Sequence, residues 1–263
     1  MQPSGHFLRP SHQQLATRTV MPMKHFCIAL LACLPLIAAA DNDVSKVNGS
    51  VHVTAASPVS DVETVNGSIR IDDGVVAKNV ETVNGSIQVG DRASVESLHT
   101  VNGGISLGQG ATASKIDTVN GTLTLGKGAR VKDGVSAVNG GARLEQNAEV
   151  AGGLSNVNGR ISLTNARVQG GIRTTSGDVL VGPGSSVAGG IVIEKPSMSL
   201  FRWNRKKPKV VIGPGATVTG TLRAEQDIDL YVSSRATIGT VTGAKAIMFT
   251  GDEPSAKDLA VEK

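Results

Sequence analysis

The stretch 194–209 holds the residues best suited to binding chemistry. It places six basic residues around the only tryptophan of the chain, with a single acidic residue. Cationic side chains next to aromatic rings can dock on anionic lipid headgroups, on a polyanionic glycan or on an acidic protein partner. The candidate binding residues are Phe201, Arg202, Trp203, Arg205, Lys206 and Lys207. The alternative is a loop that folds back, so that its large apolar side chains cover the coil surface while the cations stay in solvent.

Residue patterns typical of catalysis or metal binding are missing from the sequence. It contains no zinc-ligand spacing, no nucleophile elbow and no phosphate-binding loop. The run 72–74, Asp-Asp-Gly, is typical of a turn. His52 lies between two valines, which predicts an outward side chain, and His99 is likewise expected at the surface. We therefore expect no enzymatic activity, no metal, no cofactor and no small-molecule substrate.

A second group of polar residues recurs in the phrase Thr-Val-Asn-Gly, at spacings of 18 or 19 residues. A period this regular indicates a stacked repeat architecture. Asn-Gly tolerates positive φ at a corner, and amides one turn apart can hydrogen-bond along the axis. The predicted corner ladder is Asn48, Asn66, Asn84, Asn102, Asn120, Asn139 and Asn158.

The threonines of the same phrase would form a second ladder beside the asparagines. They are Thr64, Thr82, Thr100 and Thr118. A flat array of Thr and Asn side chains can bind an ordered surface such as ice or a polysaccharide. The alternative is a corner whose side chains only satisfy one another.

Short β-strands are the elements that would position these residues. Every sixth residue from Val47 to Val131 is Val, Ile, Leu or Ala, and three such steps make one repeat. Alternation of apolar residues, as at Ile69 and Ile71, indicates strands. Asn-Gly also signals β-hairpins, but hairpins give no reason for the six-residue step to continue between the copies. The sequence therefore predicts an all-β, single-stranded parallel β-helix of triangular cross-section, with about 18 residues per coil and about 10–11 coils.

The composition agrees with a narrow core and sets the boundaries of this solenoid. Every aromatic residue lies outside 41–194, so the core there must be built from smaller apolar side chains. We place the β-helix at 44–250, with 194–209 inserted at an Asn-Gly corner, and a polar tail at 251–263. Tyr231 and Phe249 are expected to close the C-terminal end, whereas the N-terminal end is expected to be open to end-to-end pairing.

The N-terminal residues predict export from the cytoplasm. Residues 1–22 fit no part of a leader and are interpreted as an upstream extension. Residues 23–40 combine a lysine, an apolar run and three alanines, which is typical of a cleaved signal peptide. The mature chain would then lie in the periplasm or at the cell surface. Leu-Leu-Ala-Cys at 30–33 resembles a bacterial lipobox, so a lipoprotein anchored at Cys33 is the alternative.

The formal net charge of +4 does not describe the mature chain. Residues 1–40 carry three basic side chains and no acidic one, so their removal leaves an almost neutral chain. Outside 194–209 the acidic residues of the mature chain outnumber the basic ones, which makes this stretch a local positive patch. This balance gives no argument for binding to nucleic acid.

The repeats resemble two groups of bacterial proteins. The copies of T-V-N-G-[ST]-[IL]-x-[IVL] between 64 and 125 are similar to the adhesin β-strand-repeat families of the cell envelope, including auto-transporter adhesin heads. The segments 179–191 and 210–222, with V-G-P-G and I-G-P-G, resemble bactofilins. That resemblance implies a polymer-forming, right-handed triangular β-helix, although bactofilins are generally cytoplasmic and lack a cleaved leader.

The same segments are also similar in sequence to the repeats of hexapeptide acyltransferases, which are left-handed β-helices. A left-handed coil needs small inward residues where this chain has a row of mostly charged side chains, and burying them would be costly. These are Glu63, Glu81, His99 and Asp117. A right-handed coil is therefore favoured.

These observations lead to two hypotheses about function. We expect a non-enzymatic structural or adhesin-like scaffold of the cell envelope that associates with itself end to end. The alternative is a binding module that recognises a polyanionic glycan, an anionic membrane surface or an acidic envelope protein through 194–209.

Overall fold

The computed structural model describes residues 42–54, 58–196 and 206–255. The chain divides into two units, Met1–Ala40 and Asp41–Lys263, and only the second contains described residues. The upstream extension, the signal peptide with the Cys33 alternative, and Phe201, Arg202, Trp203 and Arg205 of the candidate loop all lie outside the described residues. No helix that could cross a membrane occurs in the described part of the chain.

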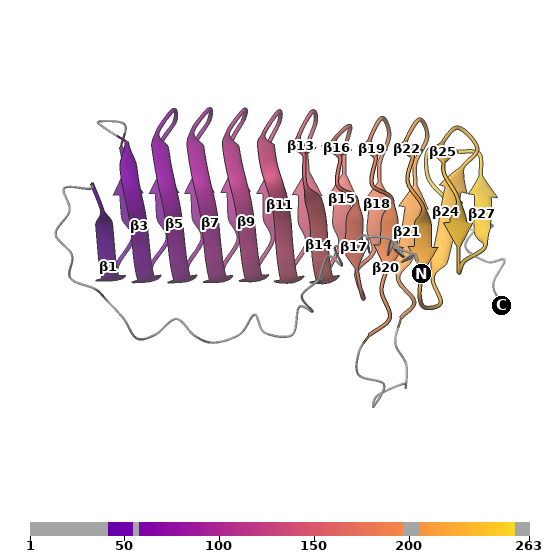
Figure 1. The fold of residues 1–263 in the computed structure, drawn as a ribbon, viewed down its shortest axis with the longest axis horizontal. Helices are drawn as coiled ribbons and strands as arrows, with labels where there is room; N and C mark the ends of the chain where they lie inside the picture. The colour runs from indigo at the N-terminus through magenta and orange to yellow at the C-terminus, as the bar shows by residue number, and fades with distance from the viewer. Residues whose placement is uncertain (1–41, 55–57, 197–205, 256–263) are drawn as a thin grey trace, which may run out of the picture. The chain divides into compact units, whose positions relative to one another are not determined.

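The second unit consists of short β-strands that form two parallel sheets. Paired strands lie one turn apart, so that Asn84 pairs with Asn102 and Ile87 with Ile105. The turns follow one another in chain order from indigo to yellow in Figure 1. The predicted all-β parallel solenoid of about 18 residues per turn is confirmed, with eleven strands in one of its two sheets. We call the side of the solenoid that this sheet forms, directly after the Asn-Gly corner, the second face.

The second face consists of one short strand from every turn. Its strands are β2 (Val51–Val53), β4 (Ile69–Ile71), β6 (Ile87–Val89), β8 (Ile105–Leu107), β10 (Leu123–Leu125), β12 (Ala142–Leu144), β15 (Ile161–Leu163), β18 (Val179–Val181), β21 (Lys209–Ile212), β24 (Asp229–Ser233) and β27 (Ala246–Phe249).

In each turn the chain runs along a third face and then along a first face before it reaches the Asn-Gly corner. The strands of both faces belong to the other sheet. In the early turns one long strand runs along both faces. These strands are β1 (Val44–Asn48), β3 (Val59–Asn66), β5 (Val76–Asn84), β7 (Ser94–Asn102), β9 (Thr112–Asn120) and β11 (Arg130–Asn139). From β13 onward each face has its own strand, since glycine pairs such as Gly152-Gly153 interrupt the extended chain between them.

The separate strands of the later turns continue the two faces. The third face has β13 (Glu149–Val150), β16 (Arg167–Val168), β19 (Ser186–Val187), β22 (Thr217–Val218) and β25 (Thr237–Ile238). The first face has β14 (Gly153–Asn158), β17 (Ile172–Thr174), β20 (Ile191–Ile193), β23 (Leu222–Ala224) and β26 (Val241–Thr242). Residues 194–208 of the insertion lie between β20 and β21, where the earlier turns have the Asn-Gly corner, and Lys209 begins β21.

A narrow column of aliphatic side chains forms the core. Alternation decides which residues enter it, because Ile69 and Ile71 are buried while Arg70 between them is exposed. Each buried side chain packs on its equivalents about 4.8 Å above and below, in the neighbouring turns. Among the described residues, the main core cluster contains no aromatic side chain.

The six-residue apolar step that led to the predicted solenoid does not follow the core at one corner. The valines of the four Thr-Val-Asn-Gly copies are half-buried, and Val47 of the Lys-Val-Asn-Gly copy is 68% exposed. They are Val47, Val65, Val83, Val101 and Val119. Strand alternation continues from Val62 to Thr64, which places the threonine inside and the valine outside.

The expected closure of the core by Tyr231 and Phe249 is also wrong. Both side chains are buried, but neither belongs to the main core cluster. Tyr231 lies between the core residues Leu230 and Val232, so it projects from the opposite side of the second face.

Candidate functional site

The predicted asparagine ladder lies at the corner between the first and second faces. Its seven residues end the first-face strands from β1 to β14, and their side chains are exposed. From Asn66 to Asn158, each Nδ2 donates a hydrogen bond to Oδ1 of the asparagine one turn earlier, at 2.9–3.0 Å. The amides thus bind one another along the axis.

The threonines of the same motif lie inside the solenoid, so the Thr and Asn side chains do not form the flat exposed array that could bind an ordered surface. Thr64, Thr82, Thr100 and Thr118 are 0–4% exposed. Their hydroxyls donate to the carbonyl oxygens of Gly49, Gly67, Gly85 and Gly103 at 3.0–3.2 Å. The inward hydroxyls thus supply a hydrogen-bond donor to these corner carbonyls. In a later turn the buried Asn156 amide donates to the Gly140 carbonyl instead.

The corner glycines have a different role from the one that the sequence indicated. Positive φ was expected, but of the seven Asn-Gly corners only those at Gly49 and Gly159 have it, and no ladder asparagine does. At the other corners a Cβ atom would overlap the carbonyl oxygen of the glycine one turn earlier. They are Gly67, Gly85, Gly103, Gly121 and Gly140. Close stacking of the backbone therefore requires glycine.

The described end of the candidate loop forms a basic corner, which we define as Arg160, Ser176, Asp178, Lys206 and Lys207. Together with Gly159 these residues line a shallow cavity of about 260 Å³. One Asp178 carboxylate oxygen lies 3.4 Å from Lys206 Nζ and 3.8 Å from Arg160 Nη2. The other accepts a 2.9 Å hydrogen bond from the Lys209 N–H. Cations outnumber the carboxylate, so the corner suits an anionic group.

Arg160, Ser176 and Asp178 were not predicted as part of this site. They come from the two turns before the insertion, and only the stacking of those turns brings them to its base. The available signal was position: each lies at or just after the corner that the insertion replaces one or two turns later.

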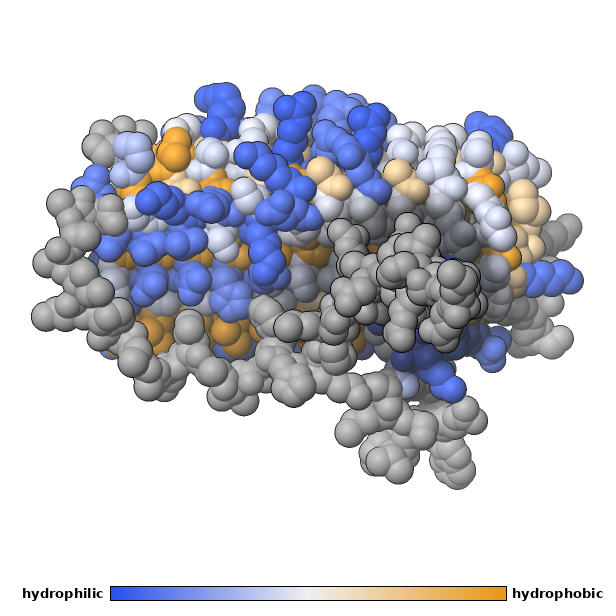
Figure 2. Space-filling view, in the orientation of Figure 1, coloured by the Kyte–Doolittle hydropathy of each residue, from blue (hydrophilic) through white to orange (hydrophobic). Residues whose placement is uncertain are grey.

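The outward column of the second face changes character along the molecule. Its first seven members are polar: His52, Arg70, Gln88, Ser106, Thr124, Arg143 and Ser162. Its last four are apolar or aromatic: Leu180, Val211, Tyr231 and Ile247. Lys209 Nζ lies 5.6 Å from the centroid of the Tyr231 ring. Rows of hydrophilic side chains also run along the face shown in Figure 2.

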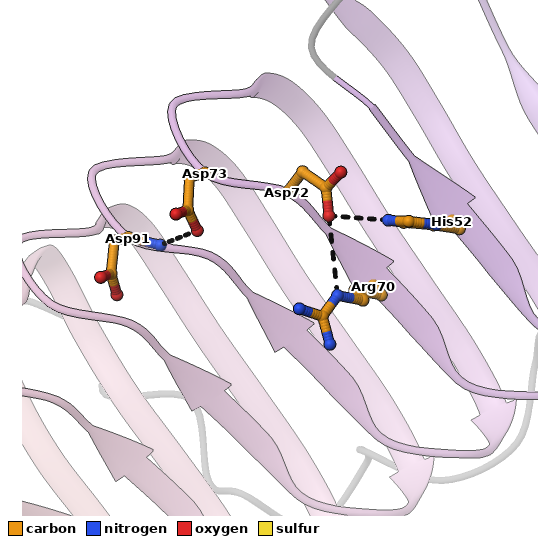
Figure 3. Close-up of polar contacts among 5 residues, drawn as sticks. All are labelled: His52, Arg70, Asp72, Asp73 and Asp91. Carbon is orange, nitrogen blue, oxygen red and sulfur yellow. Dashed lines mark hydrogen bonds and ion pairs between the residues drawn. The ribbon is translucent and has the colours of Figure 1, made fainter.

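Acidic side chains of the early turns bind neighbouring turns (Figure 3). His52 Nε2 lies 2.7 Å from Asp72 Oδ1, and Arg70 Nε lies 3.6 Å from the same oxygen. The hydrogen bond with His52 is the main cause that lowers the pKa of Asp72. Asp73 accepts a 2.8 Å hydrogen bond from the Asp91 N–H. Within the residues that the structure describes, no group of three or more His, Cys, Asp or Glu side chains could hold a metal ion.

Glu63 lies in an acidic patch near the N-terminal end of the solenoid. Its neighbour one turn later is Glu81, and Asp61 and Asp43 lie nearby. Partial burial is the largest cause that raises the pKa of Glu63, followed by repulsion from Glu81, Asp61 and Asp43. Repulsion between the carboxylates of this patch is therefore unfavourable for the folded protein.

Comparison of the chain with protein-family models, with curated proteins and with solved structures finds no match.

Proposed function

We propose that the chain is a non-enzymatic structural rod of the bacterial cell envelope, an adhesin-like or bactofilin-like scaffold that associates with itself through its ends. The observation that carries this proposal is that the outermost described strands of the first and second faces are paired on one side only. Among the described strands, β1 pairs only with β3 and β2 only with β4. At the other end β26 pairs only with β23 and β27 only with β24. An open parallel edge is a template for a strand from another chain.

The use of the polar columns supports a structural role. The asparagine amides and the threonine hydroxyls make hydrogen bonds to the neighbouring turn. Each turn then depends mainly on the turns beside it, which is the construction of repeat proteins that act as extended scaffolds.

Imaging of the purified chain 41–263 tests the scaffold. Electron microscopy and mass photometry over a range of concentrations should show linear particles whose masses are multiples of the monomer. A strictly monodisperse monomer at high concentration would contradict self-association.

Export is a separate part of the proposal and has its own test. N-terminal sequencing of the protein from a periplasmic fraction should find a chain that begins at Asp41. Metabolic labelling with a fatty acid that depends on Cys33 would instead establish the lipoprotein alternative.

The basic corner favours a second candidate function, recognition of a polyanionic glycan, an anionic membrane surface or an acidic envelope protein. The described residues that would bind the anionic partner are Arg160, Lys206 and Lys207, which lie around Asp178. We would measure binding to a sulfated polysaccharide and to vesicles that contain phosphatidylglycerol. The double variant K206Q/K207Q should lose binding, whereas K127Q/K132Q, which changes two exposed lysines elsewhere, should keep it. Deletion of 195–208 should abolish binding and leave assembly intact.

A further inference from the structure

We infer that two copies join head to tail in register, so that β1 and β2 of one copy continue the first and second faces from β26 and β27 of the other. This inference rests on the proposed self-association and specifies its geometry. A heterologous contact of this kind does not close on itself and generates an open filament.

The inward column of the first face is incomplete at both ends. Val44 is its first member and pairs with Val62, and Val241 is its last and pairs with Leu222. Both end members are only half-buried, whereas Val62 and Leu222 are 0% and 1% exposed. Placing Val44 of one copy over Val241 of another would bury both side chains, and removal of apolar surface from water is favourable.

The second face ends in the same way at its C-terminal edge. Ala246 and Met248 continue the columns of Leu230 and Val232, which are core residues. Ala246 is half-buried, and Met248 is 57% exposed although its column is buried one turn earlier. In Figure 2 hydrophobic side chains are visible at this end of the described surface. Val51 and Val53 begin the same two columns at the N-terminal edge, where they are 1% and 5% exposed, so the apolar surface that a joint would cover on this face belongs mainly to Met248.

The described part of the tail adds no strand to these two edges. Arg235 Nη2 forms a 2.7 Å ion pair with Asp252, which ties the tail to the start of the third-face strand β25. The edges of β26 and β27 have no described strand on their outer side.

Charge favours unlike ends over like ends. The first turns carry Asp43, Asp61, Glu63 and Glu81, which already repel one another. Two N-terminal ends in contact would bring two such patches together, and like charges across an interface are unfavourable. The same outward column ends in Arg223 and Thr242 at the other end of the molecule. Head-to-tail contact places Ser45 over Thr242 and keeps the two acidic patches apart.

Cysteine pairs can test the register, because the only cysteines of the sequence are Cys27 and Cys33 and the chain 41–263 has none. Ser45 and Thr242 are exposed ends of one column, so S45C/T242C should place the two thiols on adjacent strands of different copies. Adjacent strands lie within the distance that a disulfide requires. Mild oxidation should give a ladder of covalent multimers on a denaturing gel.

The controls separate the register from assembly itself. S45C/R223C is displaced by one turn and should give few multimers, and each single variant should give few dimers. Strong dimers of S45C alone would show contact between like ends and overturn the inference, while the proposed scaffold would stand. A failure of the unmodified chain to assemble would overturn both.

A charged side chain at the joining edge gives an independent measurement. Met248→Lys would bury a lysine in the proposed contact and should weaken association about tenfold or more. Leu180→Lys places the same charge on an exposed apolar position in the middle of the solenoid and should leave association unchanged. Circular dichroism of both variants checks that they fold. Equal association of M248K and the unmodified chain would contradict the inference.

Discussion

Strand alternation places Thr64 inside the solenoid, and a hydrogen bond to the neighbouring turn satisfies its hydroxyl there. Thr64 and Val65 both suit a strand, so propensity does not choose between them. The Gly49 carbonyl accepts from the Thr64 hydroxyl, and this bond favours the threonine inside. The spacing of the sequence was enough to predict that the asparagines share one column. It did not show the direction of the threonines, because the carbonyl that needs a donor is visible only in three dimensions.

Thr100 provides a test of this bond. Thr100→Val keeps the shape of the side chain but leaves the Gly85 carbonyl without its donor, so we expect a loss of about 1–3 kcal/mol in the free energy of unfolding. Chemical denaturation measures the loss. Thr100→Ser keeps the hydroxyl and should lose less. An equal loss for both variants would mean that packing, and not the hydrogen bond, matters at this position.

Glu63 provides a pH-dependent test. Its pKa is raised in the folded protein, so the folded state binds the proton more tightly than the unfolded chain does. The ionised carboxylate therefore lowers stability, and this cost appears as pH rises from the ordinary carboxyl pKa through the raised one. Glu63→Gln should raise the melting temperature at pH 7 and give no such gain at pH 3, where the carboxyl is protonated in both states. The same gain at both pH values would contradict this electrostatic origin.

At the scale of elements, the distance between stacked backbones explains where glycine is required. A Cβ atom on Gly103 would overlap the Gly85 carbonyl, whereas one on Gly153 would meet its nearest neighbour at 3.7 Å. Gly103→Ala should therefore cost about 1–3 kcal/mol or more, since the backbones must separate. Gly153→Ala is the matched control and should cost much less. Thermal unfolding compares them, and similar melting temperatures would mean that the corner can relax.

The three-strand plan of each turn was largely predictable, but the boundaries of the strands were not. The apolar alternation predicted a strand on each face, and the structure has them. In the early turns, however, one strand such as β5 runs across two faces, because residues like Lys78 and Asn79 allow the extended chain to continue. From Gly152-Gly153 onward the long strand is divided into two, because glycine lies at the bend between the two faces. The repeat spacing carries no information about this division.

At the scale of the whole molecule, turns are interchangeable units. Deleting 85–102 removes one complete turn and joins Asn84 to Gly103, so every column stays in register. We expect this variant to fold with lower stability, because one set of contacts between neighbours is lost. Deleting 85–93 removes half a turn, displaces the apolar columns from the core and should abolish folding. Far-ultraviolet circular dichroism and thermal unfolding distinguish the two. An unfolded 85–102 deletion would contradict independence of the turns.

The candidate site was less predictable than the fold at this scale. The basic residues of 194–209 stand out in the sequence, but their carboxylate partner Asp178 is 31 residues before Lys209 and meets it only because the turns stack. The predicted right hand of the coil stays a prediction, as do the ligand of the basic corner and export.

The asparagine ladder also determines which Asn-Gly step of the protein should deamidate first. Asn-Gly steps deamidate when the glycine nitrogen attacks the asparagine side chain, and asparagine is among the heat-labile residues of proteins. Within the ladder this nitrogen is engaged, since the Gly103 N–H donates to the Asn120 carbonyl and the Gly140 N–H to the Asn158 carbonyl. At the last rung, no described group accepts the Gly159 N–H.

Chemical damage should therefore begin at Asn158 and spread inward. Each conversion to aspartate would place a negative charge beside the next amide and remove a donor from the column. Peptide mapping by mass spectrometry after storage at mildly alkaline pH should find the first isoaspartate at Asn158, with Asn84 and Asn102 protected until the turns open. Uniform deamidation at all seven asparagines would show that the ladder gives no protection. If Asn158 deamidates first, the extent of its deamidation reports the time since the protein was synthesised.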